Sequence, residues 1–170
     1  MLTVTLLVSA MMALTSGNDT SINATLPDTN LATGSMTCPN HWIQFNDRCF
    51  HFVPRSLSWV KAQQNCQSMD ANLASVHSIE EYYAIQNIVK GSSAGETNTW
   101  IGGTDCQEEN AWFWMDGTPF KFTNWCEGEP NNSQNNQRCL RINYGVDKCW
   151  DDFQCYSSHP SVCVKNAEKS

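Results

Sequence analysis

"CEGEPNNSQNNQRCLRINYGVDKCWDDFQC", residues 126–155, contains four cysteines and two groups of oxygen-bearing side chains. The first group is the Glu-Pro-Asn motif at 129–131 with the side-chain amides that follow it, and the second is the pair of aspartates in the Trp-Asp-Asp motif at 150–152. Asn, Ser, Gly and Pro are typical of surface loops, so a solvated connection explains the first group without any ligand. Carboxylate and amide oxygens are also the ligands that Ca²⁺ prefers. The stretch therefore has two interpretations, a surface loop or a cation site.

The length and the N-terminal residues of the chain indicate one secreted domain. The chain has 170 residues, of which 41% are hydrophobic, enough for a single core. Residues 1–17 contain an apolar run from Leu2 to Leu14 and end in small residues, although no Lys or Arg precedes the run. This pattern predicts a signal peptide over 1–17. No later segment has the about eighteen apolar residues that a membrane span requires, so we expect a secreted product without one.

Residues 18–37 differ in composition from the residues that follow. They are rich in Asn, Thr, Ser and Asp and contain few large apolar side chains, so they bury too little surface to fold. We interpret them as a flexible leader or propeptide. The pattern changes at Cys38, where we expect the folded domain to begin.

The charge of the chain restricts its partners. The formal net charge is -7, the isoelectric point is near 4.9, and no cluster of Lys and Arg is present. These features argue against nucleic acid or an anionic membrane as a partner. A cation is a more favourable ligand than an anion for an acidic protein. The acidic charge also has a simpler explanation, because it keeps a secreted protein soluble.

The cysteines predict disulfides. None of them forms the paired Cys-x-x-Cys clusters of a zinc site, and a secreted chain folds in an oxidising environment. The nine cysteines are residues 38, 49, 66, 106, 126, 139, 149, 155 and 163. Four bridges leave one sulfur over, which implies either an intermolecular bond or a thiol without a partner.

Local patterns predict a hairpin followed by a helix. In "CPNHWIQFNDRCFHF", residues 38–52, aromatic and aliphatic residues flank an Asn-Asp turn, which favours a hairpin closed by Cys38 and Cys49. In "SLSWVKAQQNCQSM", residues 56–69, four apolar side chains recur at helical spacing, so Cys66 should point inward. These apolar residues are Trp59, Ala62, Cys66 and Met69.

A second helix is predicted in "SIEEYYAIQNIVKG", residues 78–91. Ser78 and Glu81 have the spacing of a capping box, and Gly91 stands where the helix should end. Its apolar stripe is Tyr82, Ile85 and Val89. After this helix the chain shows short β-like runs separated by turns, so the predicted fold class is α+β.

The ordered motifs resemble a known family. They are Cys66 on the first helix, "WIGG" at 100–103, "EPN" at 129–131, Cys139, "WDD" at 150–152, Cys155 and Cys163. Over about residues 38–165 the chain resembles a C-type lectin-like domain, which implies a folded domain over 38–165 and a short tail at 166–170. The resemblance implies an α+β fold with two helices, a small antiparallel β region and a long calcium-binding loop, stapled by disulfides. The bridges it implies are Cys38–Cys49, Cys66–Cys163 and Cys139–Cys155.

Within that family the chain is similar to the fish type II antifreeze proteins and their lectin relatives. This similarity rests on the additional Cys126 and Cys149, on "WIGGTDC" and on the N-terminal leader, and it implies a Cys126–Cys149 bridge. That subgroup usually carries ten cysteines, with the sulfur at the position of Cys106 bridged to a cysteine at the position of Arg138. The resemblance therefore identifies Cys106 as the unpaired thiol and allows a disulfide-linked homodimer through it.

In sugar-binding members of the family, one calcium ion is held by the residues that match the two oxygen-rich motifs. The matching positions here are Glu129, Asn131, Gln137, Asp151 and Asp152. All are oxygen donors, and a cis peptide before Pro130 would turn the flanking side chains toward the ion. The chain departs from the family pattern because Gln137 replaces an acid and Asp151 replaces an asparagine. We expect a single ion, because Asn132 and Arg138 replace the acids of a second site.

The same resemblance implies glycan binding. The order of acceptor and then donor in "EPN" goes with mannose-type sugars, and the sugar-contacting positions are Glu129, Asn131, Gln137 and Asp151. We therefore expect a secreted, calcium-dependent lectin with a role in innate defence.

Two other functional classes remain open: an ice-binding protein on the same fold and a calcium-free partner binder. The antifreeze relatives that depend on calcium carry Gln-Pro-Asp or Lys-Pro-Asp at the motif, which favours the lectin. Neither a Gly-x-Ser-x-Gly nor a His-Glu-x-x-His motif is present, so we do not expect an enzyme.

Overall fold

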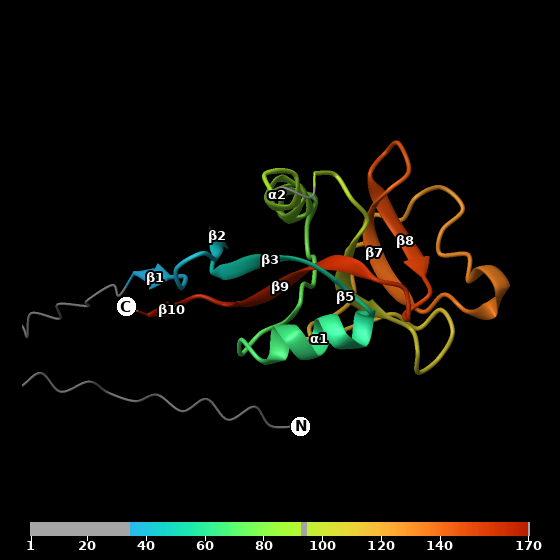
Figure 1. Cartoon of the computed structure of the whole chain (residues 1–170), viewed down its shortest axis with the longest axis horizontal. Helices are drawn as coiled ribbons and strands as arrows, with labels where there is room; N and C mark the ends of the chain where they lie inside the picture. Colours follow the sequence, from blue (N-terminus) through green and yellow to red (C-terminus); the bar gives the residue numbers. More distant parts are fainter. Residues whose placement is uncertain (1–34, 93–94, 170) are drawn as a thin grey trace, which may run out of the picture. The chain divides into compact units, whose positions relative to one another are not determined.

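The computed structural model describes residues 35–92 and 95–169 (Figure 1). The predicted signal peptide at 1–17 and the leader up to residue 34 lie outside the described residues. The described part has the α+β fold that the sequence predicted. It contains two α-helices, α1 (Trp59–Gln67) and α2 (Ile79–Lys90), and none of its helices is long and apolar enough to cross a membrane.

Eight strands of the described part form one sheet. Its main path is β2–β3–β9–β5–β7–β8, while β4 pairs with β9 and β6 pairs with β5. The strands are β2 (Ile43–Phe45), β3 (Arg48–Leu57), β4 (Asn72–Leu73), β5 (Thr99–Thr104), β6 (Phe113–Trp114), β7 (Cys139–Tyr144), β8 (Cys149–Phe153) and β9 (His159–Asn166). Most pairs are antiparallel, as predicted, but β5 and β9 run parallel at Trp100 and Ser161.

The predicted hairpin forms between β2 and β3, with Asn46 at a positive φ of 53° in the turn. Figure 1 shows α1 and α2 on opposite sides of the β3–β9 pair. The Ser78 hydroxyl caps α2 by accepting from the Glu81 amide at 3.2 Å. The other half of the capping box is different from the prediction, because the Glu81 carboxylate accepts from the His77 amide at 2.7 Å.

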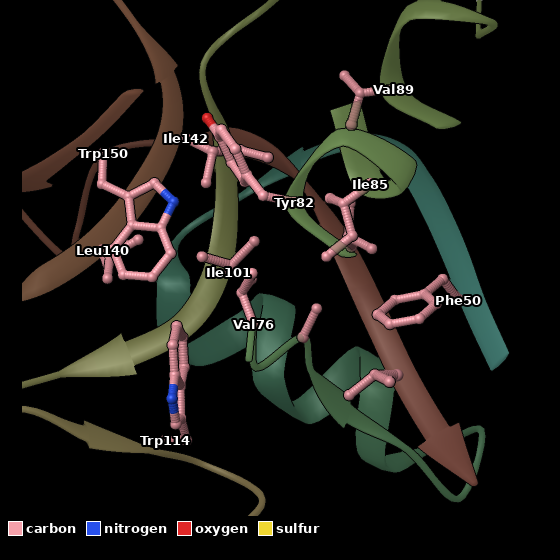
Figure 2. Close-up of a cluster of buried hydrophobic side chains, with 13 residues drawn as sticks. Phe50, Val76, Tyr82, Ile85, Val89, Ile101, Trp114, Leu140, Ile142 and Trp150 are labelled. Atoms are coloured by element: carbon pink, nitrogen blue, oxygen red, sulfur yellow. The ribbon is translucent and has the colours of Figure 1, made fainter. Parts of the chain in front are cut away.

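One of two hydrophobic clusters in the described part lies between α2 and the strands, and the other contains the buried apolar residues of α1. Figure 2 shows Tyr82 and Ile85 of α2 in one cluster with Phe50 of β3 and Trp150 of β8. Trp150 is fully buried and its ring meets Trp114 edge to face at 5.7 Å. Burial of an aromatic side chain is among the largest stabilising contributions available to a small domain. The core therefore fixes β8, the strand that carries the Trp-Asp-Asp motif.

Four disulfides link the described part of the chain, across 11 to 97 residues of sequence. Cys38–Cys49 closes the hairpin, and Cys66–Cys163 connects α1 to β9 across 97 residues. Cys126–Cys149 and Cys139–Cys155 join β7 and β8 to the adjoining loops. These are the pairs that the resemblance implied, and Cys106 is free and exposed.

Two further strands lie at the edges of the predicted domain. β1 (Met36–Thr37) pairs antiparallel with β10 (Glu168–Lys169). The strand pairing thus extends two residues into the predicted leader and into the predicted tail. The backbone groups of these segments pair with each other instead of with water, which is why ordered structure continues beyond 38 and 165.

Candidate calcium and sugar site

The start of the oxygen-rich loop is attached to β8. The Cys126 amide donates to the Trp150 carbonyl at 2.9 Å, and the Trp150 amide donates to the Asn124 carbonyl at 2.8 Å. The Cys126–Cys149 disulfide reinforces this attachment. The start of the loop therefore lies beside the strand that carries Asp151 and Asp152.

Asp152 holds the loop in place through two backbone amides. Its Oδ1 accepts from the Asn131 amide at 2.9 Å, and its Oδ2 accepts from the Asn132 amide at 2.8 Å. Hydrogen bonds to a charged acceptor are stronger than neutral ones. The peptide bond between Glu129 and Pro130 is cis. These hydrogen bonds hold the motif at 129–131 against β8.

The five residues named from the sequence lie close together. The Asn131 side-chain amide donates to Glu129 Oε1 at 2.8 Å. The Ser133 amide donates both to Asn131 Oδ1 at 2.8 Å and to Gln137 Oε1 at 2.6 Å. One carboxylate oxygen from each of Glu129, Asp151 and Asp152 lies within 4.8 Å of the others. The structure therefore gathers three carboxylates and two amide oxygens at one end of the sheet.

Electrostatics at this position favour a cation. Burial and the neighbouring Asp152 and Asp151 carboxylates raise the pKa of Glu129 to about 7. Burial also raises the pKa of Asp151, and Arg141 opposes that increase. Arg141 therefore compensates part of the charge of Asp151, whereas no ion pair of the described residues reaches Glu129. The donors are all oxygens, as Ca²⁺ requires, so the residues fit a bound calcium ion.

Comparison with known proteins gives the family. The model of the lectin C-type domain matches residues 55–165. This chain belongs to the C-type lectin domain family. The match covers both helices and all the residues of the candidate site.

Individual relatives include both antifreeze proteins and lectins. The type-2 ice-structuring protein of Osmerus mordax is 44% identical over 165 residues, which cover 95% of this chain and 91% of that protein. Ladderlectin of Oncorhynchus mykiss is 46% identical over 132 residues, which cover 77% of this chain and 70% of that protein. A solved Ca²⁺-dependent type II antifreeze protein in its Ca²⁺-free form has a TM-score of 0.71 and 42% identity, covering 76% of this chain and 100% of that one.

In this C-type lectin domain, Arg141 is a site residue that the sequence reasoning missed. Arg141 on β7 pairs in register with Asp151 on β8, and its Nε lies 2.6 Å from Asp151 Oδ2. Both side chains are buried, with exposed fractions of 8% and 3%. A lone arginine among the apolar residues of "CLRINYG" was the available signal, because a charged side chain is rarely buried without a partner.

Arg138 has a separate role in this C-type lectin domain. Its guanidinium lies 3.2 Å from Asp105 and 3.3 Å from Glu109, and the Asn132 side-chain amide donates to Glu109 at 2.8 Å. The hydrogen bonds from Asn132 and Arg138, together with the charge of Arg138, lower the pKa of Glu109. The Arg138 guanidinium therefore pairs with both Asp105 and Glu109.

Proposed function

We propose that this protein is a secreted, calcium-dependent carbohydrate-binding lectin with a role in innate defence. One calcium ion would be held by Glu129, Asn131, Gln137, Asp151 and Asp152. The supporting observation is the convergence of three carboxylates within 4.8 Å, next to the exposed Asn131 amide. The proposed activity is binding and not catalysis.

The motif at 129–131 supports selection of mannose-type sugars. Glu129 is an acceptor and the Asn131 side-chain nitrogen is a donor, and at present they bond to each other at 2.8 Å. Two adjacent sugar hydroxyls can replace that bond, because one donates to Glu129 and the other accepts from Asn131. The bound calcium ion would supply the remaining coordination for these hydroxyls.

Asp151 and Gln137 have a weaker case as sugar contacts. Asp151 is 2% exposed and Gln137 is 6% exposed. Asp151 also gives one oxygen to Arg141 and, when ionised, has no hydrogen to donate. We therefore assign these two residues to the metal and assign direct sugar contact to Glu129 and Asn131.

Retention on mannose-agarose tests this function. We expect the protein to be retained in calcium and released by EDTA. Glu129→Gln with Asn131→Asp reverses the acceptor and donor order, so this variant should lose mannose retention and gain retention on galactose-agarose while keeping the ion. Retention on mannose that is unchanged by EDTA, or unchanged in this variant, would contradict the proposal.

An ice-binding function is the second candidate. It is supported by the relative named as an ice-structuring protein, whose match covers 95% of this chain, and by the Cys126–Cys149 bridge. Measuring thermal hysteresis with and without EDTA separates the two functions. Thermal hysteresis without retention on mannose-agarose would support the ice-binding function and contradict the lectin function.

Cys106 can link two copies of the proposed lectin through a disulfide, which would join two sugar sites. Its thiol is exposed, and its sulfur lies 3.9 Å from that of Cys155. Oxidation of two such thiols would join two chains, and multivalency strengthens binding by weak single sites. We expect a dimer on a non-reducing gel that disappears in Cys106→Ser, with weaker retention of that variant on mannose-agarose. A monomer whose Cys106 reacts fully with a thiol reagent would contradict this prediction.

A further inference from the structure

Arg141 contacts one of the three gathered carboxylates, that of Asp151. It stands directly opposite Asp151 in the β7–β8 pair. Its Nε and Nη2 atoms both lie 2.6 Å from the same oxygen, Asp151 Oδ2. A cross-strand pair of opposite charges is favourable, and burial of both side chains strengthens their attraction.

The surroundings of Arg141 fix it in this position. Its guanidinium lies 3.4 Å from the centre of the Phe153 ring, and its Nη1 donates to His159 Nε2 at 3.4 Å. Burial, and then the charge of Arg141, lower the pKa of His159 to about 4. His159 therefore accepts this hydrogen bond as a neutral ring near pH 7 and adds no positive charge.

The net charge at the site is smaller than the number of carboxylates indicates. Glu129, Asp151 and Asp152 contribute three negative charges, but Asp151 is paired with Arg141. Among the ion pairs of the described residues, none reaches Glu129 or Asp152. Arg138 is already shared between Asp105 and Glu109. An ion at this position therefore meets two uncompensated charges instead of three.

We propose that Arg141 lowers the calcium affinity of this site through its positive charge. It holds one oxygen of Asp151 and cancels that residue's charge. Removing the positive charge should tighten calcium binding, whereas a purely structural role for Arg141 would make the same change weaken it. The inference rests on the proposed calcium function.

Calorimetric titration of calcium tests the sign of the effect. Arg141→Met keeps a long side chain over Phe153 without the charge. We expect it to bind calcium roughly tenfold more tightly than the unmodified chain, a change of about 1.4 kcal/mol in binding free energy, because the repulsion between the Arg141 charge and the divalent ion is removed. The double variant with Arg141→Met and Asp151→Asn should bind calcium more tightly than the Asp151→Asn variant, by a similar factor. Arg141→Lys keeps the charge and should bind calcium with an affinity near that of the unmodified chain.

Melting in EDTA provides a readout that needs no calcium. Arg141→Met leaves a buried carboxylate unpaired, so it should lower Tm, and the fall should be clearly smaller when Asp151→Asn is also present. Weaker calcium binding by Arg141→Met, or purely additive melting shifts, would overturn the inference. If the unmodified chain binds no calcium at millimolar concentration, the calcium function and this role of Arg141 both fail. The melting cycle then still measures the Arg141–Asp151 pair by itself.

Discussion

The variant that lacks the Cys66–Cys163 disulfide is expected to lose about 4–5 kcal/mol of its free energy of unfolding, because this bridge closes a loop of about a hundred residues in the unfolded chain. The two cysteines are 97 residues apart and both are fully buried between α1 and β9. Domains of this size are usually stable by only about 5–15 kcal/mol. The loss is therefore large enough to leave much of the Cys66→Ala/Cys163→Ala protein unfolded near body temperature.

The Cys38–Cys49 bridge provides the matched control. Its cysteines are only 11 residues apart, so its removal should cost roughly 3 kcal/mol in the same chain-entropy model. Urea unfolding of both double variants, made in a Cys106→Ser background to prevent thiol exchange, measures the two losses. Equal losses, or a larger loss for the shorter loop, would show that loop closure does not control the stability of this fold.

Calcium is expected to raise the melting temperature by roughly 8–12 °C when its concentration is about a hundred times its dissociation constant. The increase follows from about 2.7 kcal/mol of binding free energy that only the folded state receives. Without the ion, the carboxylates of Glu129 and Asp152 lie within 4.8 Å of each other, and no ion pair of the described residues reaches either of them. Calorimetric melting in calcium and in EDTA measures the difference.

Asp152→Asn is the control for this effect. It keeps a side-chain oxygen near the loop amides but removes one of the two uncompensated charges. The calcium-dependent rise in Tm should largely disappear in this variant. A rise of equal size would place the ion elsewhere in the protein.

The calcium effect should also depend on pH. In EDTA the pKa of Glu129 is about 7, above its ordinary value of 4.5, so the folded state binds this proton more tightly than the unfolded chain. Its contribution to stability is present below about pH 4.5 and is lost as the pH rises through about 7. Calcium needs the ionised carboxylate. The difference in Tm between calcium and EDTA should therefore increase from about pH 5.5 to about pH 8.

The fold was predictable because its signals are local or occur as ordered motifs. Helical spacing placed Cys66 on the buried side of α1, and the Asn-Asp turn placed the β2–β3 hairpin. The five candidate ligands were also named from the sequence, and four of them lie in the contiguous motifs "EPN" and "WDD". Local patterns failed where the partner is distant, as with Glu81, whose carboxylate bonds to Arg48 at 2.5 Å and to the His77 amide instead of completing its own cap.

The sequence by itself determined the family and the odd cysteine, and it named the oxygen-rich residues that we propose as the calcium ligand set. The tertiary structure decided how much charge that ligand set presents. From the sequence, Glu129, Asp151 and Asp152 count as three negative charges. Only the register between β7 and β8 brings Arg141 against Asp151 and leaves two. The physical reason is that charge depends on spatial neighbours, and strand pairing places residues ten apart in the chain at hydrogen-bonding distance in a buried, weakly screened position.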